Sequence, residues 1–229
     1  MKNKIFIACD TSSISKAKKI LALPKTKKVE IGYKFGMEFF YSEHGRKFIS
    51  KLKNKTIWLD LKLLDIPNTV VSSINSLRDL KNVKYITVHA SGGLEMMRKA
   101  KKTAKKVNKK LKIIGVTVLT SFNSKSFKKI GFKKSISEIV IQQAKLIKAA
   151  GLDGIVCSGH EVKKIKKICN RMDIITPGIR LKGDPQQDQK RVMTPKIAFK
   201  NGSTSIVIGR SITKGNIKNN FKKLIHSLN

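Results

Sequence analysis

Eight short apolar runs alternate along this chain with amphipathic stretches of helical periodicity. Short buried strands that alternate with helices are typical of βα units built around a parallel sheet. The predicted strands span residues 5–9, 29–33, 56–61, 85–88, 113–118, 154–157, 174–176 and 205–208. The predicted helices span residues 13–21, 36–53, 69–78, 93–108, 137–150, 161–169, 194–201 and 219–228.

Eight βα units in 229 residues predict an α/β fold, a single (β/α)8 TIM barrel that spans residues 1–229 as one domain. An open, doubly wound sheet is the structural alternative, but it usually has fewer strands and a glycine-rich first turn. Here the first predicted strand runs into Asp10-Thr11-Ser12-Ser13, which contains no glycine. The barrel is therefore the favoured architecture.

The formal net charge of +36 raises the question of a polyanionic partner. Lysines are scattered through nearly every predicted helix, and aromatic residues make up 6% of the chain without interleaving with the lysine runs. A base-stacking platform needs such interleaving. We therefore predict no specific nucleic-acid partner and keep a nucleic-acid-binding protein as an alternative class.

The distribution of apolar residues and cysteines indicates the cellular compartment of the protein. No apolar run approaches the roughly 18 residues needed to span a bilayer, and the first apolar stretch is too short for a signal peptide. Cys9, Cys157 and Cys169 show no paired spacing, which fits a reducing compartment. The sequence predicts a cytoplasmic protein without a membrane partner.

A barrel of this kind carries its catalytic groups just after the carboxyl ends of its strands. The sequence places polar residues at each of these points, namely Asp10, Lys34, Asp60 with Lys62, His89, Thr120 with Ser121, Ser158, Arg180, and Gly209 with Arg210. Gly209 permits close backbone approach, and the planar guanidinium of Arg210 suits phosphate oxygens. We therefore predict a phosphorylated substrate bound after the last two strands.

The densest charge cluster follows the third predicted strand and reads Asp60-Leu61-Lys62-Leu63-Leu64-Asp65-Ile66-Pro67-Asn68-Thr69. Residues two apart on a strand share a face, so Asp60 and Lys62 are predicted to point the same way. Charged groups are costly to bury unless they are paired or take part in chemistry. A surface ion pair on an edge strand is the alternative interpretation.

The sequence contains no pattern typical of a metal or cofactor site. It lacks His-x-x-x-His and Cys-x-x-Cys spacings, the dinucleotide-binding glycine fingerprint, and the phosphate-cradling Gly-x-x-x-x-Gly-Lys loop. We therefore predict no metal and no cofactor. His89 is interpreted as a structural hydrogen-bonding residue.

The ordered motifs resemble those of the bacterial orotidine 5'-phosphate decarboxylases over essentially the whole chain. The matching segments are residues 7–10, 34–38, 60–69, 88–90, 119–121, 176–180, 188–192 and 206–213. The resemblance implies a homodimer without metal or organic cofactor. It also implies the activity, which is decarboxylation of orotidine 5'-monophosphate to uridine 5'-monophosphate, the last step of de novo pyrimidine nucleotide biosynthesis.

The resemblance also assigns roles within the charge cluster. Lys62 would protonate C6 of the pyrimidine, and Asp60 and Asp65 would belong to its charge network. In this family the residues at the positions of Asp65 and Thr69 reach the active site of the partner subunit.

The remaining roles implied by the resemblance concern substrate binding. Asp10 and Lys34 would hold the ribose, and Thr120 and Ser121 would lie near the base. The groups that would meet or lie beside the phosphate are Gln189, Gly209, Arg210 and Arg180.

Mg²⁺-dependent sugar-phosphate decarboxylases and aldolases of the same suprafamily are the closest enzymatic alternative. They share the Asp-x-Lys-x-x-Asp motif but use an acidic residue at the end of the second strand. Lys34 occupies that position here, which disfavours Mg²⁺. Glu30 could substitute only if the strand register were shifted by four residues.

Overall fold

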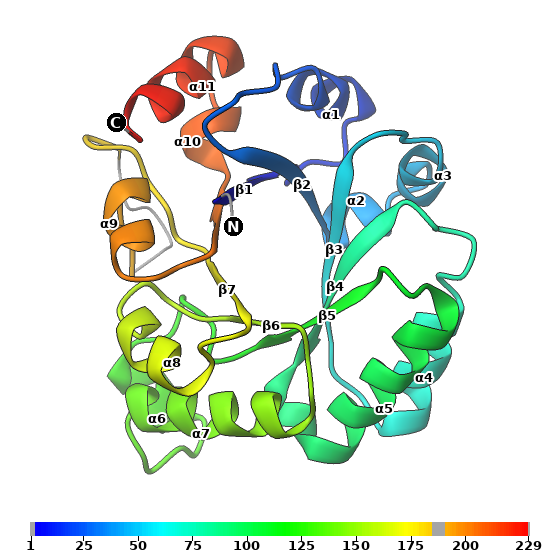
Figure 1. Ribbon diagram of the computed structural model, residues 1–229, viewed down its shortest axis with the longest axis vertical. Coiled ribbons are helices and arrows are strands. Elements are labelled where there is room, and N and C mark those ends of the chain that lie inside the picture. The colour runs from blue at the N-terminus through cyan, green and yellow to red at the C-terminus, as the bar shows by residue number, and fades with distance from the viewer. Residues whose placement is uncertain (1–2, 185–190, 229) are drawn as a thin grey trace.

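The computed structural model describes residues 3–184 and 191–228, which form a barrel with helices outside it (Figure 1). Within these residues the strands are all parallel and pair in chain order from β1 to β8. Strand β1 also pairs with β8, from Lys4 against Ser205 to Ile7 against Ile208, and this pairing closes the sheet. The predicted TIM barrel is confirmed, and the open-sheet alternative is wrong.

The strands are β1 Lys4–Ala8, β2 Glu30–Gly36, β3 Thr56–Leu63, β4 Val83–His89, β5 Lys112–Val116, β6 Gly154–Val156, β7 Asp173–Thr176 and β8 Ser205–Ile208. The helices of the first half are α1 Ile14–Leu21, α2 Met37–Phe40, α3 Gly45–Ser50, α4 Pro67–Asn75, the 3₁₀ turn η1 Ala90–Gly92 and α5 Gly93–Val107. Those of the second half are α6 Ser124–Lys129, α7 Ile136–Ala149, α8 Val162–Ile168, α9 Pro195–Lys200, α10 Arg210–Thr213 and α11 Ile217–His226.

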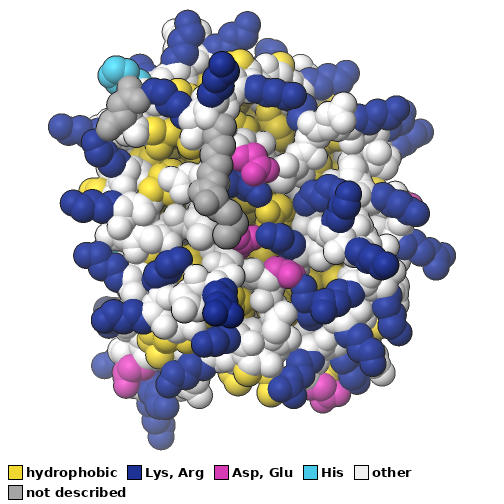
Figure 2. Space-filling view, viewed as in Figure 1, with side chains coloured by type: hydrophobic (Ala, Val, Ile, Leu, Met, Phe, Trp, Pro, Cys, Tyr) yellow, Lys and Arg dark blue, Asp and Glu magenta, His cyan; other side chains and the backbone are white. Residues whose placement is uncertain are grey.

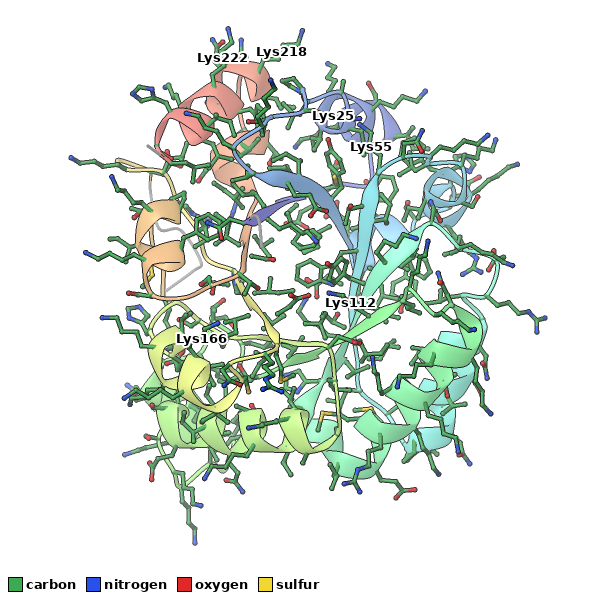
Figure 3. All side chains as sticks on the ribbon, viewed as in Figure 1. Lys25, Lys55, Lys112, Lys166, Lys218 and Lys222 are labelled. Atoms are coloured by element: carbon green, nitrogen blue, oxygen red, sulfur yellow. The ribbon has the colours of Figure 1, made fainter. Side chains whose placement is uncertain are left out.

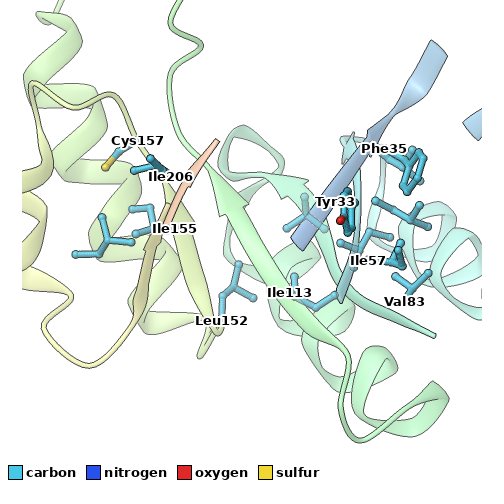
Figure 4. Packing of buried hydrophobic residues seen from close by; sticks show 14 of the residues in the cluster. Tyr33, Phe35, Ile57, Val83, Ile113, Leu152, Ile155, Cys157 and Ile206 are labelled. Atoms are coloured by element: carbon cyan, nitrogen blue, oxygen red, sulfur yellow. The ribbon is translucent and has the colours of Figure 1, made fainter. Parts of the chain in front are cut away.

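Apolar side chains are buried in two separate regions, because successive residues of a strand point to opposite faces of the sheet. The larger region lies between the strands and the helices, and Figure 4 shows part of it around Tyr33, Ile57 and Ile155. The smaller region fills the barrel interior, where the Phe6 ring meets the ring of Trp58 edge-on at a centroid distance of 4.9 Å. The interior is therefore packed with side chains and is not a channel.

The helix predicted over residues 36–53 is wrong, because the chain forms two short helices, α2 and α3, with a turn between them. The turn folds back so tightly that a Cβ on Gly45 would lie 1.7 Å from the backbone oxygen of Phe39. Ser42 Oγ also donates a hydrogen bond to that oxygen, at 2.7 Å. Apolar periodicity continues through this turn, so the sequence pattern concealed it.

Other helix boundaries differ for local reasons. Helix α4 begins at Pro67 and not at residue 69, since proline suits the first turn of a helix, where its missing N–H is not needed. Helix α6 was not predicted, although Asn123 and Ser126 form a reciprocal capping box at its start. Helix α10 is a single turn after β8 and was also not predicted.

Among the described residues, no helix combines the length and apolar character that crossing a membrane requires. Figure 2 shows lysine and arginine side chains scattered over the whole visible face, with few acidic side chains between them. The lysines labelled in Figure 3 come from several parts of the chain around the barrel: Lys25 and Lys55 lie in the loops before β2 and β3, Lys112 in β5, Lys166 in α8, and Lys218 and Lys222 in α11. On this face the positive charge is spread out and does not mark one confined patch.

Replacing Gly45 with alanine is expected to destabilise the protein by about 1–3 kcal/mol, because the new methyl group overlaps rigid backbone. Urea unfolding of Gly45→Ala and the wild type would measure the difference. Gly36→Ala is the matched control, since its Cβ would meet its nearest neighbour, Asp10 Oδ1, at an ordinary 3.7 Å. Equal stability of the Gly45 variant and the wild type would contradict the close approach.

Candidate active site

A cavity of about 300 Å³ lies at the carboxyl ends of the strands. Its floor includes Ala8, Trp58 and Val207, which also belong to the apolar cluster inside the barrel. The predicted site residues that line it are Asp10, Lys34, Asp60, Lys62, Thr120, Ser121, Arg180, Gly209 and Arg210. The fold therefore gathers residues from distant parts of the sequence around one apolar-floored pocket.

Four charged side chains of alternating sign form a chain along one side of this pocket. Lys34 Nζ lies 3.1 Å from Asp10 Oδ1 and 3.4 Å from Asp60 Oδ2. Lys62 Nζ lies 2.9 Å from the same Asp60 oxygen. Asp60 is 8% exposed, so its charge is largely removed from water. The predicted pairing of Asp60 with Lys62 is present, and the edge-strand surface pair is excluded because β3 is paired on both sides.

Strand β3 departs from regular pairing where it carries these groups. Its partner in β4 is Ile86 at Leu59 and Val88 at Leu63, so the register shifts between the two pairs. Lys62, inside this bulge, has a φ of 48°. That region of backbone conformation is unusual for a residue with a side chain. Bulges re-aim side chains and are common beside active sites.

The charge network sets the protonation of its members. Burial by itself would raise the pKa of Asp60, but the ammonium groups of Lys34 and Lys62 and the hydrogen bonds from Lys62 and Thr87 hold that pKa below its usual value. Burial would likewise lower the pKa of Lys34, yet Asp60 and Asp10 raise it above its ordinary value. Asp60 is therefore an anion and Lys34 a cation at neutral pH.

Cys157 also lines the cavity, but its thiol is not a nucleophile at neutral pH. Burial raises its pKa above the ordinary value, and the charge of Glu161 raises it further. Burial raises the pKa of Cys9 to about 12. Both cysteines are buried and free, so they act as small core side chains.

His89 ends β4 and accepts a hydrogen bond from the backbone N–H of Ser91 through Nδ1, at 3.3 Å. Burial lowers the pKa of His89, and the positive charge of Lys62 lowers it further, so the ring is neutral at pH 7. This geometry agrees with the structural role predicted for His89.

Asp65 and Thr69 are exposed in this chain, and neither is among the described residues that line the cavity. The Asp65 carboxylate accepts a hydrogen bond from the backbone N–H of Ile66 at 2.6 Å. Two large apolar side chains surround it, Leu64 at 55% exposure and Ile66 at 67%. Gln189, predicted to meet the phosphate, lies outside the described residues.

Sequence reasoning missed Thr87, whose hydroxyl donates to Asp60 Oδ1 at 3.0 Å. The available signal was a polar residue inside the apolar run Tyr85-Ile86-Thr87-Val88.

Sequence reasoning also missed a buried ion pair between Glu161, which precedes α8, and Arg191. A buried glutamate is uncommon without a partner, but the sequence gives no indication of which cation it meets.

Glu30 does not take part in the pocket. It begins β2, whereas Lys34 lies further along that strand toward its carboxyl end, and Glu30 lies 3.4 Å from Lys4 at the opposite end of the barrel. The register shift that would have made Glu30 a metal ligand is therefore wrong. Among the described residues, no group of three or more His, Cys, Asp or Glu side chains is placed to hold a metal ion.

Comparisons with known proteins agree on one family. The sequence model of the orotidine 5'-phosphate decarboxylase / HUMPS family matches residues 3–220. The chain is 45% identical over 219 residues to the orotidine 5'-phosphate decarboxylase of Carboxydothermus hydrogenoformans, covering 93% of this chain and 90% of that protein. It is 49% identical over 193 residues to that of Bacillus mycoides, covering 81% and 80%.

A solved structure gives the same result. The crystal structure of orotidine 5'-phosphate decarboxylase from Lactobacillus acidophilus superposes with a TM-score of 0.83 at 33% identity. The match covers 99% of each chain. The similarity therefore extends over the whole barrel and is not confined to the charged motif.

Replacing Asp60 with asparagine is expected to reduce stability more at pH 7 than at low pH. The unfolded carboxyl titrates near 3.8 and the folded one lower, so its stabilising contribution is present above the unfolded pKa and is lost as pH falls through the folded pKa. The gap in unfolding free energy between wild type and Asp60→Asn should therefore narrow as pH falls from about 5 toward 2.

Urea unfolding at several pH values measures that gap. Asp79→Asn, at the exposed pair with Arg46, is the control and should change stability little throughout. A gap for Asp60→Asn that stays constant with pH would show that the ionised carboxylate does not stabilise the folded state.

Proposed function

The chain belongs to the orotidine 5'-phosphate decarboxylase / HUMPS family, and from this premise we propose that it converts orotidine 5'-monophosphate to uridine 5'-monophosphate and CO₂ in pyrimidine biosynthesis. Its curated relatives make it a carboxy-lyase. The observation that carries the proposal is the alternating chain Asp10–Lys34–Asp60–Lys62 beside an apolar floor. In this arrangement Asp60 holds the Lys62 ammonium in the pocket, where it can stabilise the negative charge that develops during a decarboxylation.

Lys62 is the proposed proton donor. When the bond between C6 and the carboxylate carbon breaks, CO₂ leaves and the electron pair remains on C6. An ammonium held nearby stabilises that charge as it develops and then delivers its proton to C6. Asp60, 2.9 Å from Lys62 Nζ, favours the charged form of the lysine and restricts where it points.

No metal or organic cofactor is part of this proposal. The position where an Mg²⁺-dependent relative would need an acidic side chain is occupied by Lys34, whose ammonium already lies between two carboxylates, those of Asp10 and Asp60. A divalent cation would be repelled by Lys34 at this point. The Mg²⁺-dependent sugar-phosphate reaction is therefore not favoured.

The phosphate is proposed to bind after β7 and β8. Arg180, Gly209 and Arg210 all line the cavity there, and Gly209 leads directly into α10. Guanidinium groups and backbone N–H groups are the donors that phosphate prefers. The phosphate is remote from C6, so its binding energy can be used to lower the barrier at the reacting carbon. Asp10 and Lys34 are proposed to hold the ribose, and Thr120 and Ser121 the base.

We further propose that the protein acts as a homodimer in which Asp65 and Thr69 reach the partner's pocket. Both residues are exposed in the single chain, and the exposed Leu64 and Ile66 beside Asp65 supply apolar surface for an interface. In the dimer Asp65 would complete the charge network around Lys62.

Lys62→Ala is expected to lower turnover by at least about 10⁴-fold, because it removes both the stabilising cation and the proton donor. The ultraviolet absorbance change of orotidine 5'-monophosphate measures turnover, and calorimetry with uridine 5'-monophosphate checks that binding persists. Lys164→Ala, at an exposed position of α8, is the control and should remain fully active.

The same assay with a chelator separates the two enzyme classes. Wild-type turnover of orotidine 5'-monophosphate should be unchanged by chelation. Near wild-type activity of Lys62→Ala would remove the assignment of the proton donor. Turnover of a sugar phosphate that stops on chelation would instead support the Mg²⁺-dependent alternative.

Mixing two inactive variants tests the shared site. Lys62→Ala and Asp65→Ala homodimers should each be inactive, while a mixed dimer contains one pocket with both residues intact. Random exchange of subunits gives about half mixed dimers with one intact site of two, so activity should recover to about a quarter of the wild-type value. No recovery in a mixture shown to contain mixed dimers would place Asp65 in its own subunit's pocket.

A further inference from the structure

We propose that Thr87 is a positioning residue that fixes Lys62 and Asp60 relative to each other, a role that rests on the proposed function. Thr87 lies in β4 and is completely buried. It is not among the described residues that line the cavity, so it acts through its neighbours and not on the substrate.

The irregular pairing of β3 and β4 explains why a side chain is needed at this place. Thr87 lies between the two β4 residues that pair with β3 on either side of the bulge. Residues 60–62 of β3 therefore face this one residue, and the regular ladder of backbone hydrogen bonds is interrupted. A buried backbone N–H in such a bulge requires another acceptor.

The Thr87 hydroxyl supplies that acceptor. The backbone N–H of Lys62 donates to Thr87 Oγ1 at 2.8 Å. The hydroxyl has one proton, and it donates this proton to Asp60 Oδ1 at 3.0 Å. The direction of both bonds is fixed by chemistry, because an amide N–H only donates and an ionised carboxylate only accepts.

These bonds close a ring of contacts. Lys62 Nζ meets Asp60 Oδ2 at 2.9 Å, Asp60 Oδ1 meets the Thr87 hydroxyl, and that hydroxyl meets the Lys62 backbone. The tip and the backbone of the same lysine are thus tied to one buried carboxylate. Because Lys62 has a left-handed φ of 48°, its conformation persists only if its surroundings hold it.

Valine has nearly the shape of threonine but no hydroxyl, so Thr87→Val leaves the Lys62 N–H and Asp60 Oδ1 without this partner. We expect kcat to fall roughly 10- to 100-fold, since a small displacement of a catalytic group has effects of this size. The Kd for uridine 5'-monophosphate should stay within about 3-fold, because the phosphate groups lie after β7 and β8. Thr87→Ser keeps the hydroxyl and should retain kcat within about 3-fold.

Thr204→Val is the matched control. The Thr204 hydroxyl also accepts a backbone N–H, that of Ile174 at 2.9 Å, and donates to a backbone carbonyl, that of Ile174 at 3.2 Å. It lies just before β8, at the end of the barrel away from the pocket. This variant should lose stability as Thr87→Val does, measured by thermal unfolding, while its kcat stays at the wild-type value.

A crystal structure of Thr87→Val supplies a readout that does not depend on activity. We expect Lys62 to leave the left-handed region or its Nζ to move away from Asp60. If wild type fails to decarboxylate orotidine 5'-monophosphate, the proposed function is wrong, and this structure still decides whether Thr87 positions Lys62.

Three results would overturn the role of Thr87. One is a Thr87→Val protein whose kcat and Lys62 geometry match the wild type. Another is a serine variant as impaired as the valine variant, which would assign the effect to the methyl group. The third is an equal loss of kcat in Thr204→Val, which would indicate general loosening of the barrel.

Discussion

The structure at the mouth of this barrel depends on the contacts made by one buried carboxylate, that of Asp60. It contacts Lys34 of β2, Lys62 of β3 and Thr87 of β4, and through Lys34 it is linked to Asp10 after β1. A buried charge is strongly unfavourable unless cations and hydrogen bonds compensate it. Here two ammonium groups and a hydroxyl do so, and each comes from a different strand. The pairing of β2, β3 and β4 brings the compensating groups together, and these groups offset the free-energy cost of burying the Asp60 carboxylate.

The apolar floor strengthens the effect of those charges. Phe6, Trp58 and Tyr85 fill the barrel interior, with Phe6 edge-on to both other rings at 4.9 and 5.2 Å. Electrostatic interactions are larger where water and mobile polar groups are excluded. One end of the pocket thus offers fixed charges beside a dry surface, which suits a reaction at a carbon atom. The other end offers arginines and backbone groups, which suit a phosphate. The proposed chemistry and the proposed phosphate contacts therefore lie at different ends of the pocket.

The sequence predicted the barrel and most of the pocket because these depend on pattern. Alternating apolar runs mark the strands, and a polar residue after each strand marks the mouth. The features that the sequence did not predict depend on the register between neighbouring strands and on close contacts between residues. The bulge at residues 60–62 arises from the pairing of β3 with β4, which no single segment encodes. Lys62 adopts a left-handed backbone conformation although it is not a glycine, so its residue type did not indicate this conformation. The turn before Gly45 interrupts a continuous apolar periodicity, and only the contact with Phe39 reveals it.

The order of the site residues along the chain has a consequence for synthesis. The network residues Asp10, Lys34, Asp60, Lys62 and Thr87 all belong to the first four strands or the loops after them, whereas Arg180 and Arg210 come from the last two units. A ribosome therefore releases the groups proposed for chemistry long before those proposed for the phosphate. Strand β1, however, has β8 as one of its two neighbours, so its outer edge stays unpaired until almost the whole chain has been made. An exposed strand edge is prone to pairing with other chains. The nascent protein must keep β1 from wrong partners for most of its translation.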